Sequence, residues 1–330
     1  MTGALQNSPE YVAFVAATID TLRVTPKERA QIRNAEQGSD AWLGYRRGRL
    51  TASNFGAAAG HNKFCSVREL LKRMLWPPAK FERNAAMLHG TRHEPVARET
   101  YQAWMFEMTD DDALVERIEF AQPGLTVSLE VPWLAMSPDG EIAVYLREQP
   151  AWAPSVARGL IEYKCPFRDR PYMNPSIPDY YFDQMQGQMA IDGRATFCDF
   201  AVWTSKEISV RRVGFDADYW TNDLFPALRR FYHDEYLPRL FLKSRRKLRE
   251  GEIDAAEPVP GLLAAGAAYS VGPSPASATA GSEPAAGDDA FDVDAVHRRL
   301  AATHGDDFSH YPASIVSSGV AFDADGRVAV

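Results

Sequence analysis

Two short segments of the chain place acidic and basic side chains at the ends of apolar stretches. The first segment is Ser137-Pro138-Asp139-Gly140, and the second is Glu162-Tyr163-Lys164, which follows Leu160-Ile161. Side chains alternate along a strand, so Glu162 and Lys164 point the same way and Tyr163 points to the opposite face. If the two strands are neighbours, Asp139, Glu162 and Lys164 converge at one spot. This requirement constrains the fold more than any other feature of the sequence.

Carboxylates and a lysine at one spot indicate metal-assisted chemistry. Two carboxylates bind a hard divalent cation through oxygen, as Mg²⁺ prefers. The lysine can then orient or deprotonate a water, a set that suits hydrolysis of a phosphodiester. Each segment alone has a simpler explanation, because Pro-Asp-Gly is a common turn and Glu-x-Lys is often a solvated ion pair. The order and spacing of the two together favour the catalytic interpretation.

Length and composition predict a globular protein with one large or two small domains. The chain has 330 residues, of which 45% are hydrophobic and 11% aromatic. It has no run of about 18 apolar residues, so we expect no membrane span, and the start lacks the pattern of a secretory signal. Cys65, Cys165 and Cys198 have no metal-ligand spacing. They fit a reducing compartment inside a cell, either cytoplasm or nucleus.

The net charge of −8 is distributed unevenly along the chain. Residues 251–330 contain 12 acidic and 3 basic residues, a net charge of −9. Residues 1–250 therefore carry +1. Such a body is compatible with a polyanionic partner, although charge alone does not demand one.

Periodicity and capping signals give a coarse element map. We expect helices over residues 9–33, 82–107, 178–192 and 216–249, the last interrupted near Pro226 and Pro238. We expect three or four antiparallel strands over 113–148, and further strands over 158–164, 196–203 and 207–213. The basic end of the last helix, Arg239 to Arg249, fits a DNA contact, a nuclear address or a solvated helix end.

A candidate anion site lies near the N-terminus. Ser39 or Asp40 can begin a helix that carries Trp42 and Arg46 one turn apart, and Ser53 can cap the next helix. A helix N-terminus beside arginines binds anions well. A plain helical corner with solvated arginines is the alternative. We expect Trp42 in the core rather than as a stacking platform for bases.

The chain divides into four predicted regions. Residues 1–35 form an N-terminal helical arm, and residues 36–250 form the main domain. Residues 251–288 are rich in Ala, Gly, Pro and Ser and cannot bury enough surface to fold, so we expect a disordered linker. Residues 289–330 are expected to form an acidic, mostly disordered tail.

An ordered set of motifs resembles the phage lambda exonuclease and YqaJ-type viral recombinase family, within the nucleases that share a Pro-Asp…Asp/Glu-x-Lys core. The matching segments are E-Q-G-x-D-x-W, R-x-G and T-A-S between Glu36 and Ser53, G-x-x-x-E at Gly90 and Glu94, S-P-D-G at Ser137–Gly140, E-x-K-C-P-F at Glu162–Phe167, and Y-x-x-Q-x-Q at Tyr181–Gln186. The resemblance covers roughly residues 36–213. The loop of Arg147–Arg158 departs from it and indicates a hairpin insertion.

The resemblance implies an α+β fold of the restriction-endonuclease type, an α/β/α sandwich with a central mixed β-sheet flanked by helices. It also implies a Mg²⁺-dependent deoxyribonuclease that hydrolyses linear duplex DNA from 5′ to 3′ and leaves 3′ single-strand overhangs. Such products serve recombination or viral genome processing. Mn²⁺ is expected to substitute for Mg²⁺, because hard oxygen ligands accept it.

The resemblance assigns roles to individual residues. Lys164, Asp139, Glu162 and Gln186 would be catalytic. The metal would be held by Asp139, Glu162, Glu94 and the carbonyl of Tyr163. The DNA and its 5′-phosphate would be bound by Arg46, Ser53, Ser137 and Gln184. From the sequence alone, an ordinary ion pair of Glu94 with Arg98 is the default.

Two roles fit Lys164. As a base it must lose a proton, and since a free lysine titrates near pH 10.4 we would expect an alkaline optimum. Alternatively a metal-bound hydroxide attacks and Lys164 only orients it. The expected partners are ends of double-stranded DNA, a single-strand annealing protein and two further copies in a ring-shaped homotrimer. The alternatives are a structure-specific or single-strand endonuclease on the same core, and a catalytically dead DNA-binding protein.

Overall fold

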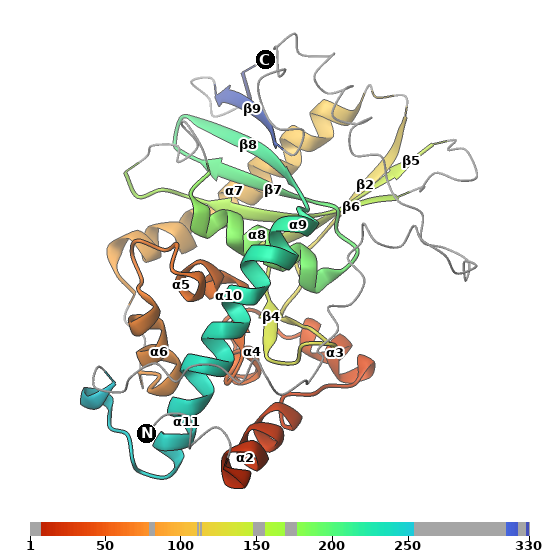
Figure 1. Ribbon diagram of the computed structural model, residues 1–330. Coiled ribbons are helices and arrows are strands. Elements are labelled where there is room, and N and C mark those ends of the chain that lie inside the picture. Colours follow the sequence, from red (N-terminus) through yellow and green to blue (C-terminus); the bar gives the residue numbers. More distant parts are fainter. Residues whose placement is uncertain are drawn as a thin grey trace, which may run out of the picture.

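A seven-stranded mixed sheet lies in the upper part of the molecule as seen in Figure 1, above the N-terminal helices. The structure, a computed structural model, describes residues 8–78, 83–110, 112, 114–147, 156–168, 177–253, 315–322 and 328–329. The sheet has the order β10-β9-β8-β7-β6-β5-β2, in which β6 and β7 are parallel and the other neighbours are antiparallel. Its strands are β2 (Val115–Ala121), β5 (Gly140–Leu146), β6 (Val156–Lys164), β7 (Phe197–Trp203), β8 (Glu207–Gly214), β9 (Ile315–Phe322) and β10 (Val328–Ala329).

Two helices cover opposite faces of this sheet, α7 (Ala85–Asp110) and α8 (Asp179–Asp192) (Figure 1). Ile161 and Tyr163 of β6 pack in one apolar cluster with residues of α7. Leu160 packs in another cluster with Met185 of α8. This alternation is the period of two expected of a strand buried on both faces. The predicted sandwich, with a mixed sheet between helices, is confirmed.

A small second sheet and a group of helices lie beside the main sheet. The small sheet has the order β1-β4-β3, in which β1 runs parallel and β3 antiparallel to β4. Residues 113–148 therefore hold four strands, as expected, but these are divided between two sheets. The additional elements are α2 (Pro9–Asp20), α3 (Pro26–Arg33), α4 (Asp40–Arg46), β1 (Leu50–Thr51), η1 (Ala52–Asn54), α5 (Phe55–Ala59), α6 (Val67–Leu75), β3 (Thr126–Val127), β4 (Leu134–Met136) and η4 (Glu250–Glu252).

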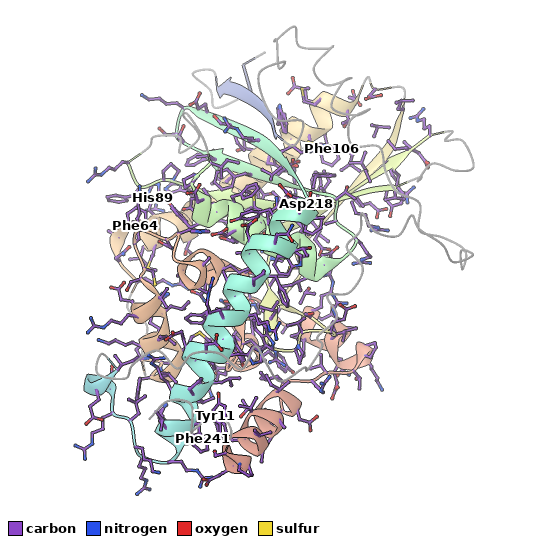
Figure 2. All side chains as sticks on the ribbon, viewed as in Figure 1. Tyr11, Phe64, His89, Phe106, Asp218 and Phe241 are labelled. Carbon is purple, nitrogen blue, oxygen red and sulfur yellow. The ribbon has the colours of Figure 1, made fainter. Side chains whose placement is uncertain are left out.

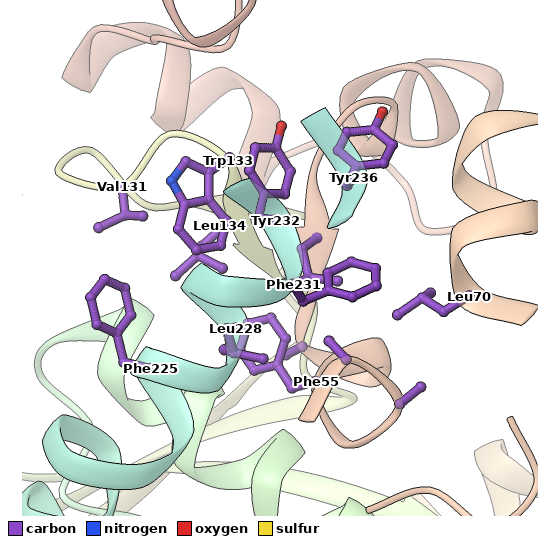
Figure 3. Packing of buried hydrophobic residues seen from close by; sticks show 14 of the residues in the cluster. Phe55, Leu70, Val131, Trp133, Leu134, Phe225, Leu228, Phe231, Tyr232 and Tyr236 are labelled. Carbon is purple, nitrogen blue, oxygen red and sulfur yellow. The ribbon is translucent and has the colours of Figure 1, made fainter. Parts of the chain in front are cut away.

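A large apolar core joins these helices to the C-terminal helical segment (Figure 3). Trp133, which is 1% exposed, stacks on Tyr232 with ring centroids 4.6 Å apart. On the other side of this core, α2 packs on the end of the C-terminal segment through Tyr11 and Phe241, whose rings meet edge-on at 5.4 Å (Figure 2).

The C-terminal helical segment continues past two prolines without breaking. It consists of α9 (Ala217–Tyr219), η2 (Trp220–Leu224), α10 (Phe225–Arg230), η3 (Phe231–Tyr236) and α11 (Leu237–Ser244). Both η2 and η3 are π-helical turns, and each immediately precedes a segment that has Pro226 or Pro238 in its first turn. A proline lacks the N–H that an α-helix needs and its ring crowds the preceding turn. The wider π turns accommodate both prolines.

Helices α5 and α8 approach so closely that glycine is required at the contact. A Cβ on Gly56 would lie 2.5 Å from Cβ of Tyr180 and 2.6 Å from its Cα. A Cβ on Gly187 would lie 2.2 Å from the ring of Phe55. This contact fixes the position of α8 relative to the N-terminal helices.

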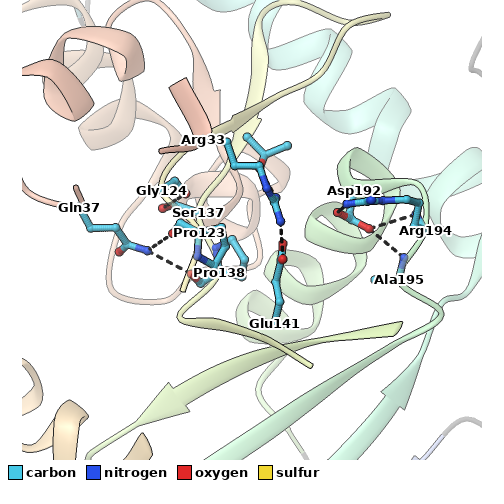
Figure 4. A network of polar contacts seen from close by, with 11 residues as sticks. Arg33, Gln37, Pro123, Gly124, Ser137, Pro138, Glu141, Asp192, Arg194 and Ala195 are labelled. Atoms are coloured by element: carbon cyan, nitrogen blue, oxygen red, sulfur yellow. Dashed lines mark hydrogen bonds and ion pairs between the residues drawn. The ribbon is translucent and has the colours of Figure 1, made fainter. Parts of the chain in front are cut away.

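The predicted arm, residues 1–35, contacts the turn that leads into β5 (Figure 4). Arg33 of α3 forms an ion pair with Glu141 and donates a hydrogen bond of 3.0 Å to Thr126. Just beyond the arm, the amide of Gln37 donates to the carbonyls of Pro123 and Pro138 at 3.0 and 3.1 Å. These contacts hold the Ser137–Gly140 segment from one side.

Most of the predicted linker and tail, from residue 254 onward, lies outside the described residues, apart from β9 and β10. β9 pairs antiparallel with β8 and so adds a strand to the central sheet. The sequence did not predict either strand. Within the described ranges, no helix is long and apolar enough to span a membrane.

Candidate active site

The structure brings Asp139, Glu162 and Lys164 together where β5 begins and β6 ends. Gly140 pairs with Ile161, so Asp139, one residue earlier, lies opposite Glu162. Oδ2 of Asp139 accepts a hydrogen bond of 2.8 Å from the backbone N–H of Tyr163. Oε1 of Glu162 accepts a hydrogen bond from Nζ of Lys164. The convergence expected from strand alternation is therefore present.

Burial strengthens the electrostatic interactions among these three groups, because little water is present to screen them. The Glu162 side chain is only 3% exposed and that of Lys164 only 17%. Burial, followed by repulsion from Glu162, raises the pKa of Asp139 well above its usual range. Burial alone would lower the pKa of Lys164, but attraction by Glu162 and Asp139 outweighs it and the pKa is raised. To act as a base, Lys164 therefore needs a cation that competes for these carboxylates.

Gln188 completes the hydrogen bonding of Glu162, and sequence reasoning missed it. Its Nε2 donates a hydrogen bond of 3.0 Å to Oε2 of Glu162, and the residue is fully buried. Its Oε1 is buried without a hydrogen-bond partner among the described residues. The signal that could have identified Gln188 is spacing, because residues four apart on a helix share a face. Gln184, one turn earlier, is also buried.

The side-chain amide of Gln186 forms hydrogen bonds with the backbone beyond β8, and its catalytic role stays a prediction. Its Nε2 donates to the carbonyl of Gly214 at 2.8 Å, and its Oε1 accepts from the N–H of Asp216 at 2.8 Å. These two bonds tie α8 to the turn between β8 and α9. These bonds are possible because, at about 100° per residue, a side chain two positions from Gln184 points to a different side of the helix.

Glu94 of α7 contributes charge near the site and also forms the expected surface ion pair. Its Oε1 lies 3.1 Å from Nη2 of Arg98. Its charge is among the causes that raise the pKa of Asp139, although burial and Glu162 act more strongly. The ring of Tyr163 packs on the α7 face, opposite Glu162 and Lys164, as expected.

The donor set of this site fits a hard divalent cation. Asp139 and Glu162 supply carboxylate oxygens whose mutual repulsion a cation would relieve, and the unpartnered Oε1 of Gln188 is a further neutral oxygen nearby. No group of three or more His, Cys, Asp or Glu side chains in the described ranges has a metal-holding arrangement. The fit to a cation therefore rests on the two carboxylates of Asp139 and Glu162. A role for Glu94 as a third carboxylate ligand remains a prediction.

Arg46 lies at the end of α4, a helix that Ser39 caps as expected. Its guanidinium stacks over the ring of Trp42 at 4.2 Å and donates a hydrogen bond of 3.0 Å to Oγ1 of Thr51. Burial lowers the pKa of Arg46 to about 10, and within the described part of the chain no carboxylate pairs with it. A largely desolvated, still charged guanidinium of this kind is suited to an anion.

Ser53 lies close to the residue that Arg46 contacts, but it does not cap a helix. Ser53 is exposed, and its Oγ lies 3.5 Å from Oγ1 of Thr51, the residue that Arg46 contacts. It does not cap α5, which begins after Asn54 without a side-chain cap, because the 3₁₀ turn η1 intervenes.

The Ser137 hydroxyl is already engaged within the protein. It donates to the carbonyl of Gly124 at 2.9 Å and accepts from Nε1 of Trp42 at 3.3 Å. The bond to Trp42 connects the indole on which Arg46 stacks to the strand segment that carries Asp139. Phosphate binding by Ser137 stays a prediction. Trp42 is half-buried and packs against a small apolar cluster, rather than lying in the core.

Several solved structures resemble the chain. An alkaline exonuclease (LHK-Exo) from Laribacter hongkongensis is 23% identical, with a TM-score of 0.44 over 63% of this chain and 97% of that one. LHK-Exo in complex with dAMP is 23% identical, with a TM-score of 0.41 over 66% and 100%. A SOX–DNA complex is 15% identical, with a TM-score of 0.23 over 55% and 37%. No curated protein matches the chain.

A family model gives the more specific match. Residues 41–195 match the YqaJ-like viral recombinase domain. This range contains the carboxylates, the lysine, the glutamines of α8 and Arg46, so the site just described lies wholly within it. The chain therefore carries a YqaJ-like viral recombinase domain over these residues.

Proposed function

We propose that this chain is a metal-dependent deoxyribonuclease that degrades linear duplex DNA from its 5′ ends and leaves 3′ single-strand overhangs. The observation that carries the proposal is the convergence of Asp139, Glu162 and Lys164 in a largely buried site, with Gln188 bonded to Glu162. The match to a viral recombinase domain supports DNA as the substrate. The overhangs would be taken up by a single-strand annealing protein.

Asp139 and Glu162 would hold Mg²⁺, with Mn²⁺ as a substitute, and the carbonyl of Tyr163 and Glu94 are further candidate ligands. A bound divalent ion supplies an activated water at neutral pH and stabilises charge on a phosphoryl oxygen. Gln188 fixes the direction of the Glu162 carboxylate. Lys164 holds a proton at Nζ, from which it can donate to a water or to a phosphate oxygen.

Arg46 supports the assignment of a 5′-phosphate site. It is a positively charged group held between Trp42 and Thr51, with the exposed hydroxyl of Ser53 beside it. A guanidinium binds a phosphate through paired N–H donors, and removal from water strengthens that attraction. A site that holds the terminal phosphate near the carboxylates would set the direction of degradation.

The experiment compares wild-type protein and Lys164→Ala on blunt linear DNA labelled at either the 5′ or the 3′ end, and on the closed circular form. We expect the wild type with Mg²⁺ to release the 5′ label early from the linear form only. Chelation of the metal should abolish release, and Mn²⁺ should restore it. Lys27→Ala, which changes an exposed lysine on α3, is the matched control and should cut at the wild-type rate.

The other outcomes separate the alternatives. Cutting of circular DNA would replace the proposal with an endonuclease. Early release of the 3′ label would reverse the polarity. Equal inactivity of wild type and Lys164→Ala, with DNA binding retained, would identify a DNA-binding protein without hydrolysis.

A further inference from the structure

The loop of residues 60–66, between α5 and α6, exposes an aromatic ring. Phe64 is 73% exposed, more than any other large hydrophobic residue in the described ranges. An isolated exposed hydrophobic residue needs no special explanation. Phe64 is not isolated, however, because its loop is braced and its ring is the outer end of a row of rings.

Hydrogen bonds brace the loop on both sides of Phe64. The N–H groups of His61 and Asn62 donate to the carbonyl of Gly56 at 2.8 and 3.0 Å. The side chain of Asn62 accepts from the N–H of Phe64 at 2.8 Å. The ring of His61 is anchored through Nδ1, which lies 2.9 Å from Oδ2 of the fully buried Asp183. The exposed ring is therefore presented in a fixed position, so binding loses little conformational freedom.

A row of aromatic rings leads from this loop to the candidate active site. Phe64 meets Tyr180 edge-on, with ring centroids 6.0 Å apart, and Tyr180 meets Tyr181 at 4.4 Å. Nζ of Lys164 lies 4.9 Å from the ring of Tyr181. Phe64 is thus three contacts away from the lysine of the site, within reach of a strand a few nucleotides long.

The loop of Phe64 has two basic neighbours, Lys63 and Arg73, and it also contacts the carboxylates of Glu69 at Ser66 and of Asp183 at His61. Nζ of Lys63 lies 5.1 Å from the centre of the Phe64 ring, and residues 60–66 contain no acidic residue, although the whole chain carries −8. The exposed Arg73 donates to Asn54 at 3.3 Å and to Sγ of Cys65 at 3.0 Å. Aromatic faces beside positive charge bind single-stranded nucleic acid, because the base stacks while the phosphates are neutralised.

We propose that Phe64 is a stacking site for an unpaired nucleobase of the DNA strand that is bound at Lys164. The proposal rests on the proposed function for its ligand class. Bases inside a duplex are stacked on their neighbours and offer no free face, so the occupant is a base of single-stranded DNA or of a frayed end. Lys63 neutralises a phosphate of the same strand.

The test measures binding of a single-stranded oligonucleotide that contains one 2-aminopurine, whose fluorescence falls on stacking. Full-length protein is used with chelator present, so that no DNA is cut. Because one aromatic–base stack is worth about 1–3 kcal/mol, Phe64→Ala should weaken binding roughly 5- to 150-fold and remove the quenching. Phe64→Trp should retain both, and Phe64→Leu, which is apolar without a ring face, should lose both.

The matched control is Phe106→Ala, which removes another exposed phenylalanine that lies well apart from Phe64 on the molecule (Figure 2). It should bind and quench as the wild type does. If Phe64→Ala binds the oligonucleotide and quenches its fluorescence as strongly as the wild type, Phe64 is not a stacking site, even if the protein hydrolyses DNA. Loss of both in Phe64→Ala, in a wild-type protein that never hydrolyses DNA, would support the stacking site and overturn the proposed function.

Discussion

Gln188 and Gln186 lie two residues apart on α8, and their exchange for methionine should have opposite consequences. Gln188 bonds only to the Glu162 carboxylate, and its own oxygen has no hydrogen-bond partner in the described structure. Gln186 bonds to two backbone groups far from the site. Methionine has a similar length and volume but cannot donate. Comparing the two variants therefore separates loss of the bond that positions the Glu162 carboxylate from loss of the bonds that attach α8 to the rest of the fold.

The hydrogen bonds give the expected magnitudes. A hydrogen bond to a charged group is worth about 1.5–3 kcal/mol. If Gln188→Met loses that amount from the metal-bound state, Mg²⁺ affinity should fall roughly 10- to 150-fold, which agrees with the roughly 10- to 100-fold effects known for groups that orient metal ligands. Its stability should change little, because the substitution also removes an unpartnered buried oxygen.

Gln186→Met loses two hydrogen bonds between uncharged groups. Its free energy of unfolding should therefore fall by about 1–3 kcal/mol, while its Mg²⁺ affinity should not change. Calorimetric titration with Mg²⁺ measures the metal affinity, and urea unfolding in the presence of chelator measures the free energy of unfolding. Loss of metal affinity in Gln186→Met but not in Gln188→Met would refute these roles for the two side chains. Identical behaviour of the two variants in both measurements would refute them as well.

Three further substitutions test other parts of the structure. Arg46→Ala should bring the rates on 5′-phosphorylated and 5′-hydroxyl duplex ends to equality, and a retained preference measured with end-labelled DNA would exclude Arg46 from the phosphate site. Asp199→Asn should lower the free energy of unfolding in urea by about 3–5 kcal/mol, because it weakens the paired 2.7 Å bonds between Arg212 and the buried Asp199. Burial lowers the pKa of His233 to about 4. Between pH 6.5 and 4 the unfolded chain therefore binds a proton at this residue that the folded protein does not bind. The free energy of unfolding should fall over this range by up to about 3 kcal/mol. His233→Phe should remove that part of the acid sensitivity in unfolding curves recorded across this range.

The strands that build the site were predictable because their signals are local. Glu162 and Lys164 end an apolar run, and alternation alone places them on one face. The helix that carries the glutamines was also expected, and α8 begins within one residue of that expectation. The division of residues 113–148 between two sheets was not predictable. Strand pairing depends on contacts between distant segments, here β1 with β4, which local patterns do not record.

The roles of individual polar residues were harder to predict than the elements that carry them. The motif match selected Gln186, whereas helical phase places Gln188 at Glu162. It assigned Ser137 to the phosphate, but the hydroxyl bonds to Trp42 and Gly124. In both cases a neighbour from another part of the chain decides which atoms are free to act. Hydrogen-bond partners of this kind follow from the three-dimensional arrangement, and a single sequence contains no direct signal for them.

The contacts of the N-terminal segment show why the candidate site is not confined to the segments that carry its charges. Asp139 belongs to a turn that has few apolar residues of its own to hold it. Arg33 pairs with Glu141 immediately beyond the turn, and Gln37 binds the carbonyl of Pro138 immediately before Asp139 (Figure 4). Because carboxylate ligands must be held to within a fraction of an ångström to bind a small cation well, these two side chains contribute to the geometry of the site. The helical arm predicted as a separate region is therefore part of the scaffold that positions the first carboxylate.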